Sequence, residues 1–143
     1  SLNNARQKSR DAKRVSDMKS IQTPLELYDV DNDSYPAGTA LELGEGVDCG
    51  GNPCDTISST NGISDAAAGT TYMGLIPTDP NSNNTECAHA GGDATGCTYS
   101  YTQTGSGTGY DIYFYLEGAT GDLPAGEACA SENGITGAGA ACP

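Results

Sequence analysis

The first thirty residues of the chain carry apolar side chains at helical spacing. Seven of them recur at steps of three, four or seven residues, with the charged side chains between them: Ala5, Ala12, Val15, Met18, Ile21, Leu25 and Tyr28. This spacing predicts an amphipathic helix. Because Pro24 removes one backbone donor, we expect the helix to bend or split near Thr23. The turn-forming run YDVDNDSYP over residues 28–36 should end it.

A second pattern, with a period of two, covers residues 99–117. Its apolar positions fall on one side of the extended chain: Tyr99, Tyr101, Tyr110, Ile112, Phe114 and Leu116. This alternation predicts two strands, and the GSGTG between them predicts a hairpin turn. Residues 37–98 show little regular pattern beyond a short helix over 64–68 and an apolar segment over 72–77. The Gly- and Ala-rich tail over 118–143 predicts an irregular C-terminal loop.

Together these elements predict an α+β fold in which a long N-terminal helix packs on a small antiparallel β-sheet, loop-rich and stapled by disulfides. We expect residues 1–36 to form an amphipathic helical stem with its terminating turn, and residues 37–143 to form a globular head. The helix stripe should pack on the apolar face of the hairpin through these side chains: Val15, Met18, Leu25 and Tyr28 from the helix, and Tyr99, Tyr101, Ile112, Phe114 and Leu116 from the sheet.

The composition leaves this fold with a thin hydrophobic core. Leu, Ile, Val and Phe together make up only 18 of the 143 residues, and the formal net charge is −13. A chain with so little apolar bulk is typical of disorder unless something else stabilises it. Cross-links, aromatic packing or neighbouring copies of the chain must therefore contribute to its stability.

The charge is divided unevenly along the chain. All six basic residues lie within residues 1–19 beside two acidic ones, which gives +4, whereas residues 20–143 contain 17 Asp or Glu and no Lys or Arg. Nucleic-acid binding draws most of its affinity from Lys and Arg, so we do not expect nucleic acid to be a partner. Five of the basic residues lie in the first 14 positions, which we expect to protrude from the head into solvent: Arg6, Lys8, Arg10, Lys13 and Arg14.

Six cysteines are the strongest chemical feature of the head. Zinc sites use C-x2-C pairs or several His ligands, and this chain has neither. Disulfides fit the spacing better, and although six cysteines allow fifteen pairings, they fall into three close neighbours. We therefore predict the pairs Cys49–Cys54, Cys87–Cys97 and Cys129–Cys142, and with them a location at the cell exterior or envelope.

A weak calcium candidate lies where the helix should end. Asp29, Asp31 and Asp33 alternate as D-x-D-x-D, which is how a calcium loop begins. The match stops there, because Ser34 occupies the position at which such a loop needs Gly. A helix terminator made of turn-forming Asp and Asn explains the same residues, and we expect no other metal and no cofactor.

The sequence offers little for catalysis. His89 is the single histidine and lies in a polar loop, and none of the motifs that position a nucleophile or a phosphate occurs, so we do not expect an enzyme. Two sequons for N-glycosylation are present, at Asn32 (NDS) and Asn83 (NNT). They matter only in a host that has the modifying enzyme.

Three segments resemble one known superfamily. The stretch SLNNARQKSRDAKRVSDMKSIQTPLELYDVDNDSYP resembles the segment just after the membrane-spanning part of bacterial type IV pilins and of the pseudopilins of type II secretion. LIPTDP is similar to the L-P-x-D-P element of those proteins, and YSYTQTGSGTGYDIYFYLEGATGDLPAG is similar to the closing hairpin of one group of such pilins. Pro24 and the cysteine-rich head depart from the family pattern.

The resemblance implies properties that composition cannot give. It implies a pilin-like head and a precursor whose short leader is cleaved ahead of a hydrophobic helix, which would lie before Ser1 and would anchor the subunit in the inner membrane. It also implies a filament in which these helices bundle at the centre. The pair Cys129 and Cys142 resembles the disulfide loop that closes many pilin heads.

Three functions compete on this basis. The leading one is a structural subunit of an extracellular type IV pilus-like filament, a homo-oligomer at the cell surface that follows a membrane-anchored precursor stage. The basic residues of the first 14 positions would then meet carboxylates of neighbouring heads. The alternatives are a major pseudopilin of a type II secretion system and a secreted, disulfide-stapled binding domain.

Overall fold

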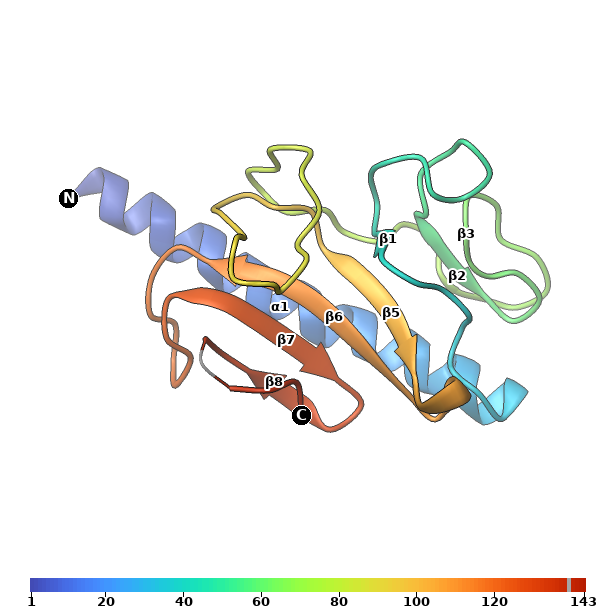
Figure 1. The fold of residues 1–143 in the computed structure, drawn as a ribbon. Helices are drawn as coiled ribbons and strands as arrows, with labels where there is room; N and C mark the ends of the chain where they lie inside the picture. The colour runs from blue at the N-terminus through green and yellow to red at the C-terminus, as the bar shows by residue number, and fades with distance from the viewer. Residues whose placement is uncertain (139) are drawn as a thin grey trace.

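The structure is a computed structural model that describes residues 1–138 and 140–143. Its longest element is helix α1, Leu2–Asn32 (Figure 1). The Ser1 side chain accepts a hydrogen bond from the backbone N–H of Asn4, and Asp33 ends the helix in the left-handed conformation. The expected split near Thr23 is wrong, since α1 continues through Pro24 as one helix. Pro24 is buried, so its packing against the head offsets the lost backbone hydrogen bond.

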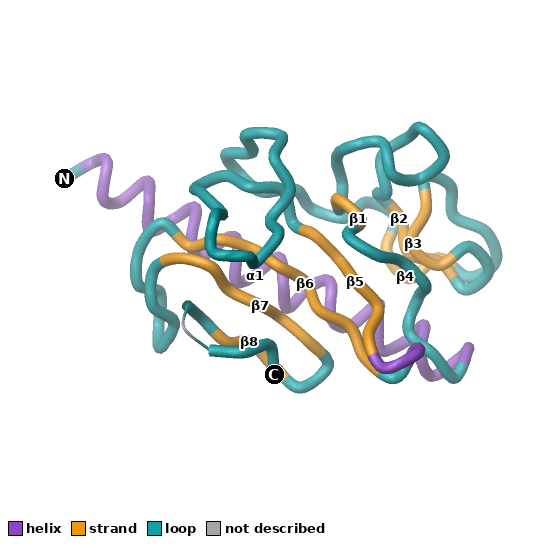
Figure 2. Tube along the Cα trace, viewed as in Figure 1, coloured by secondary structure: helices purple, strands orange, loops and turns teal. Residues whose placement is uncertain are grey.

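The head contains two antiparallel sheets. The larger sheet has the strand order β1-β5-β6-β7-β8, with these bounds: β1 Leu41–Glu42, β5 Ser100–Thr104, β6 Gly109–Leu116, β7 Gly126–Ser131 and β8 Gly134–Thr136. The smaller sheet has the order β3-β2-β4, with β2 Thr56–Ser58, β3 Gly62–Ser64 and β4 Thr71–Met73. Helix α1 runs along one face of the larger sheet (Figure 2). The fold is therefore α+β, with one helix packed on antiparallel sheets.

The predicted hairpin is confirmed. Strands β5 and β6 pair with Tyr101 opposite Ile112, and the 3-10 turn η1, Gly105–Gly107, connects them. Along β6 every second side chain is fully buried, whereas the residues between them are half-buried. The period of two in the sequence therefore reports a strand with one face on the core.

The predicted contact between helix and sheet is confirmed for most of its members. One continuous core includes Met18, Ile21 and Leu25 of α1, with Val15 packed at its margin, and these residues of the hairpin: Tyr99, Tyr101, Tyr110, Ile112, Phe114 and Leu116. Tyr28 differs, since it lies edge-on against Tyr72 of β4, at 6.5 Å between ring centroids. The helix thus contacts both sheets.

Two expectations about irregular segments are wrong. The tail beyond residue 118 is not an irregular loop, because β7 and β8 extend the larger sheet by two strands. Ala128 and Ala130 of β7 are fully buried in the core. The short helix expected over residues 64–68 is also absent from the described chain, since Ser64 ends strand β3.

The three predicted disulfides are confirmed. They connect Cys49 to Cys54, Cys87 to Cys97 and Cys129 to Cys142, with Cα atoms 5.2, 5.0 and 5.3 Å apart. Each closes a loop of the head whose own apolar content is low, which compensates for the thin core. Within the described residues, no helix has the length and apolar character needed to cross a membrane.

Candidate functional site

A group of charged residues joins α1 to one end of its head. We call it the helix–head junction, and it consists of Arg10, Asp11, Arg14, Asp79 and Glu117. Arg10 and Asp11 are adjacent on α1, and Arg14 lies one turn further along the helix. Asp79 belongs to the loop that contains LIPTDP, and Glu117 directly follows β6. Residues more than sixty positions apart in sequence therefore meet here.

Arg14 is the centre of the junction, and its side chain is fully buried. Its Nε and Nη2 donate to the two carboxylate oxygens of Asp79 at 2.7 and 3.1 Å, which is a bidentate pair. Its Nη1 donates to Asp11 at 2.8 Å and to Glu117 at 2.6 Å. Burial alone would lower the pKa of Arg14, but the hydrogen bonds to Asp79, Glu117 and Asp11 outweigh it and raise that pKa. The guanidinium is thus charged and fully paired.

Asp11 fixes the backbone that follows β6. Its two carboxylate oxygens accept the N–H groups of Glu117 and Gly118, each at 2.9 Å. Asp11 is itself only 2% exposed, so these contacts satisfy a buried carboxylate rather than a solvated one. The end of the central strand is therefore held directly on the helix.

Glu117 also accepts hydrogen bonds from a second arginine, Arg10. Nε and Nη2 of Arg10 donate to its two oxygens, both at 2.7 Å. The hydrogen bond from Arg10, with a further one from Arg14, lowers the pKa of Glu117 from 4.5 to about 2, although burial opposes the shift. Glu117 is therefore ionised throughout the physiological range and bridges two turns of α1.

A neighbouring pair extends these contacts along the helix. Lys13 donates to Asp17 at 2.7 Å and to the backbone oxygen of Thr78 at 3.2 Å. The hydroxyl of Tyr99 donates to the same Asp17 carboxylate at 2.7 Å. Burial, together with the charge of Asp17, raises the pKa of Tyr99. Helix, LIPTDP loop and sheet are thus connected a second time, one turn further along α1.

The five residues predicted for assembly separate into two groups. Arg10, Lys13 and Arg14 pair with carboxylates of their own chain, and for the fully buried Arg14 the expectation that it meets a neighbouring head is wrong. Arg6 and Lys8 are exposed and form no ion pair with any residue that the structure describes. The protruding segment also ends earlier than residue 14, since Asp11 is already buried.

Sequence reasoning missed the acidic half of the junction. Asp11 and Arg14 stand three residues apart on a predicted helix, a spacing that favours an ion pair. Asp79 lies in the LIPTDP element, yet its carboxylate gave no sign of a partner 65 positions away. Nothing distinguished Glu117 from the other carboxylates of an acidic head. Contacts of this kind depend on the tertiary fold.

The three carboxylates of the calcium candidate, Asp29, Asp31 and Asp33, lie along the end of helix α1. Asp29 and Asp31 lie in the last turn of α1, and Asp33 follows as the helix end, with its N–H bonded to the backbone oxygen of Asp29 at 2.7 Å. Asp31 instead accepts a hydrogen bond from the hydroxyl of Tyr72. Among the described residues, these three carboxylates do not gather around one point. Asp33 ends the helix, while Asp29 and Asp31 lie within it.

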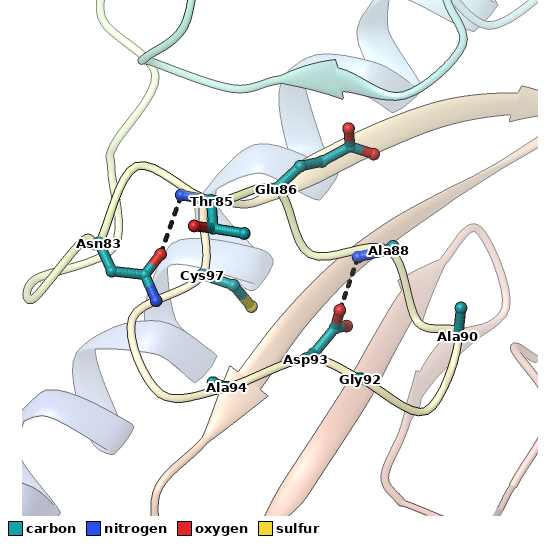
Figure 3. A pocket seen from close by; sticks show the side chains of 9 residues that line it. All are labelled: Asn83, Thr85, Glu86, Ala88, Ala90, Gly92, Asp93, Ala94 and Cys97. Carbon is teal, nitrogen blue, oxygen red and sulfur yellow. Dashed lines mark hydrogen bonds between the residues drawn. The ribbon is translucent and has the colours of Figure 1, made fainter.

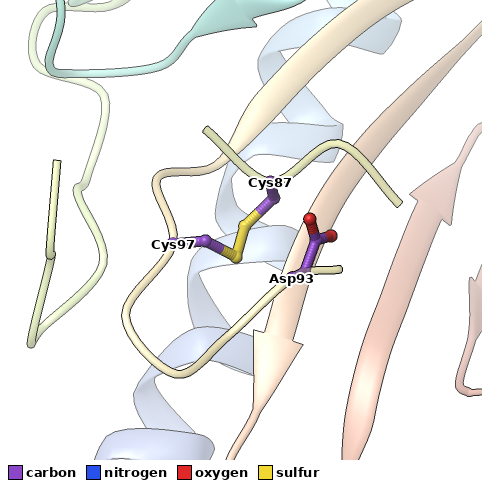
Figure 4. A group of neighbouring side chains, drawn as sticks. All are labelled: Cys87, Asp93 and Cys97. Atoms are coloured by element: carbon purple, nitrogen blue, oxygen red, sulfur yellow. A yellow bond between two sulfur atoms is a disulfide. The ribbon is translucent and has the colours of Figure 1, made fainter. Parts of the chain in front are cut away.

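A second feature is the loop closed by Cys87 and Cys97, which encloses a hollow of about 380 Å³ (Figure 3). Asp93 crosses it and accepts the N–H groups of Ala88 and His89 at 2.9 and 2.7 Å. Asp93 also lies near both sulfur atoms, but these form the disulfide and present no thiolate to a metal (Figure 4). The loop therefore holds its shape through covalent and backbone contacts.

The helix–head junction and the Cys87–Cys97 loop both hold segments of the chain together. At the junction two arginines meet three carboxylates, and no described side chain there is placed as a nucleophile beside a base. No family model, no curated protein and no solved structure matches the chain.

Proposed function

We propose that the chain is a structural subunit of an extracellular type IV pilus-like filament, assembled through its N-terminal helix from many copies of itself. The resemblance of residues 1–36, of LIPTDP and of the hairpin supports the superfamily. The α+β fold, with one long helix along an antiparallel sheet, suits a subunit of this kind. In this proposal the subunit reaches the cell surface after a membrane-anchored precursor stage.

The observation that carries the proposal is the protruding segment, which we define as residues 1–9. Eight of these nine residues are exposed, and only Gln7 is half-buried. Figure 1 shows this end of α1 extending beyond the sheet. Leu2, a large apolar side chain in this segment, is 66% exposed. A helix that extends past its own head is available to other copies.

The charges of the protruding segment and of the head also support contact between copies of the chain. The head lacks any Lys or Arg, whereas the protruding segment presents Arg6 and Lys8 without ion-pair partners in the described chain. An exposed ion pair contributes only about 0 to 1 kcal/mol, but a filament repeats each contact and excludes water from it. Arg6 and Lys8 are therefore the residues through which we expect the segment to contact other copies.

The disulfides support a location outside the cytoplasm. Three cross-links of this type form and persist in oxidising compartments such as the envelope and the exterior. A subunit with a small hydrophobic core gains stability from disulfides, and they persist outside the cytoplasm. The secreted binding domain shares this advantage, so the disulfides do not separate the two functions.

Immunogold electron microscopy tests the proposal directly. Antibodies raised against the described head should label long surface filaments on intact cells that make the chain. Labelling confined to the envelope, without long fibres, would contradict the filament and favour the pseudopilin. Recovery of the chain only as a single subunit in the medium would contradict both and favour the secreted domain.

A further inference from the structure

The two N-glycosylation sequons lie in very different structural settings. N-linked glycans are bulky and hydrophilic, so their acceptor asparagines belong to surface loops of exported proteins. Asn83 lies in the exposed loop ahead of Cys87, whereas Asn32 is the last residue of helix α1. The structure can therefore separate the two sites, which the sequence could not.

Asn83 and Thr85 form a compact, accessible pair. The side-chain oxygen of Asn83 accepts the N–H of Thr85 at 2.9 Å, which brings the threonine back beside the amide (Figure 3). The Asn83 backbone N–H donates to Gly96 at 2.7 Å and anchors the turn to the far side of the loop. Both residues are exposed. The amide and the hydroxyl-bearing residue of the sequon are thus presented together at the surface.

Asn32 lacks this arrangement. Its side-chain amide donates to the backbone oxygen of Tyr28 at 3.0 Å, within the last turn of α1. The third residue of its sequon, Ser34, is half-buried, and its hydroxyl donates to the backbone oxygen of Tyr35 at 3.0 Å. The helical backbone at Asn32 and the half-buried, hydrogen-bonded hydroxyl of Ser34 keep the sequon from presenting its amide and hydroxyl together.

We propose that Asn83 is an N-glycosylation site and that Asn32 is not. The co-substrate is an oligosaccharide carried on a polyprenyl diphosphate, and a membrane-bound transferase of the host catalyses the step. The side-chain nitrogen of Asn83 attacks the anomeric carbon of the first sugar and forms a C–N bond. The bond from that carbon to the diphosphate oxygen breaks, the lipid diphosphate leaves, and the nitrogen gives up one proton.

The surroundings of Asn83 suit a linked sugar. The amide nitrogen donates one of its two hydrogens to the backbone oxygen of Thr95 at 3.1 Å. A glycosylated amide keeps one N–H, so this hydrogen bond can persist and orient the first sugar. The adjoining hollow of about 380 Å³ has Ala88, Ala90 and Ala94 in its lining. Their methyl groups offer a non-polar surface to the face of a pyranose ring.

Peptide mass spectrometry on the chain isolated from the cells that make it tests this site. Because no Lys or Arg follows Lys19, digestion after glutamate is suitable, and it separates residues 46–86 from residues 27–42. We expect the peptide 46–86 to carry an added saccharide mass at Asn83 and the peptide 27–42 to have its sequence mass. An unmodified 46–86 peptide throughout, or a saccharide on a hydroxyl residue instead, would overturn the proposal.

Matched variants made in the same cells sharpen the test. Asn83→Gln and Thr85→Val should lose the saccharide completely, whereas Thr85→Ser and Asn32→Gln should keep it. Mapping of the Cys87–Cys97 disulfide checks that each variant has folded, so that loss through misfolding is recognised. A saccharide that persists in folded Thr85→Val, or that disappears in folded Asn32→Gln, would overturn the assignment to the Asn83 sequon.

Discussion

Arg6 and Arg14 lie two turns apart on one helix and have the same side chain, yet their surroundings are opposite. Arg6 is exposed and has no ion-pair partner within the described chain, whereas Arg14 is fully buried between three carboxylates. The difference arises because the sheet ends alongside residues 10–14 of α1. The basic residues appear alike in the sequence. In the fold, however, Arg10 and Arg14 form ion pairs with the head, whereas Arg6 and Lys8 are exposed to solvent.

The largest expected effect is a difference in the free energy of unfolding between alanine variants of these two arginines. Arg14→Ala should lower the free energy of unfolding by about 3 to 5 kcal/mol, because Asp11 and Asp79 remain buried without their counter-charge. Arg6→Ala should change it by less than about 0.5 kcal/mol, since a solvated side chain is lost. Urea unfolding of both variants measures the contrast. Equal stability of the two variants would show that the division is wrong.

A smaller effect is expected at Glu117, and it depends on pH. Glu117→Gln should cost about 1.5 to 3 kcal/mol at neutral pH, because it weakens charge-assisted hydrogen bonds from two arginines. The folded-state pKa of Glu117 is lowered from 4.5 to about 2. Its contribution is therefore complete above pH 4.5 and disappears as the pH falls toward 2.

Unfolding free energies measured at several pH values check this window. The difference between the parent chain and Glu117→Gln should be constant from pH 7 to pH 5 and should shrink between pH 4.5 and pH 2. Because other carboxylates also titrate in acid, the variant serves as the control for them. A difference that grew on acidification would contradict the assignment of the ion pairs.

The Tyr99 hydroxyl should have a more modest effect. Tyr99→Phe removes the donor to Asp17 but leaves the ring in the core and Lys13 beside the carboxylate, so we expect a loss of about 1 kcal/mol. Tyr115→Phe is the matched control, since that residue is only half-buried on the other face of β6. Thermal unfolding of both variants, read as a shift in Tm, measures the difference. Identical shifts would mean that the Asp17 contact contributes nothing.

Local pattern explains which parts of this structure the sequence could predict. The helix and the hairpin follow from periodicities of apolar residues, and close cysteine spacing led to the three disulfides. Strand β7 was missed because Cys129 lies between its core residues Ala128 and Ala130, so the run ACA shows no alternation of apolar and polar residues. It becomes a strand by pairing with β6, and that contact is not local.

The junction was missed for the same reason. Arg14 reaches Asp79 and Glu117 across 65 and 103 positions, and nothing in an acidic head identifies which carboxylates become buried. The sequence shows that the basic residues cluster in one segment, but which of them are paired and which are free depends on where β6 ends. Which charged residues become buried is therefore determined by the tertiary fold and not by local sequence.

Charge reversal on the protruding segment tests the account most directly. The double variant Arg6→Glu with Lys8→Glu should unfold like the parent chain, because neither side chain contacts a carboxylate of its own head. In cells it should give far fewer surface filaments, while the charge-conserving pair Arg6→Lys with Lys8→Arg should assemble normally. Filament counts at low and high salt are the measurement. If the reversed subunit folds and assembles as abundantly as the parent at both salt concentrations, the protruding segment does not mediate assembly through its charge.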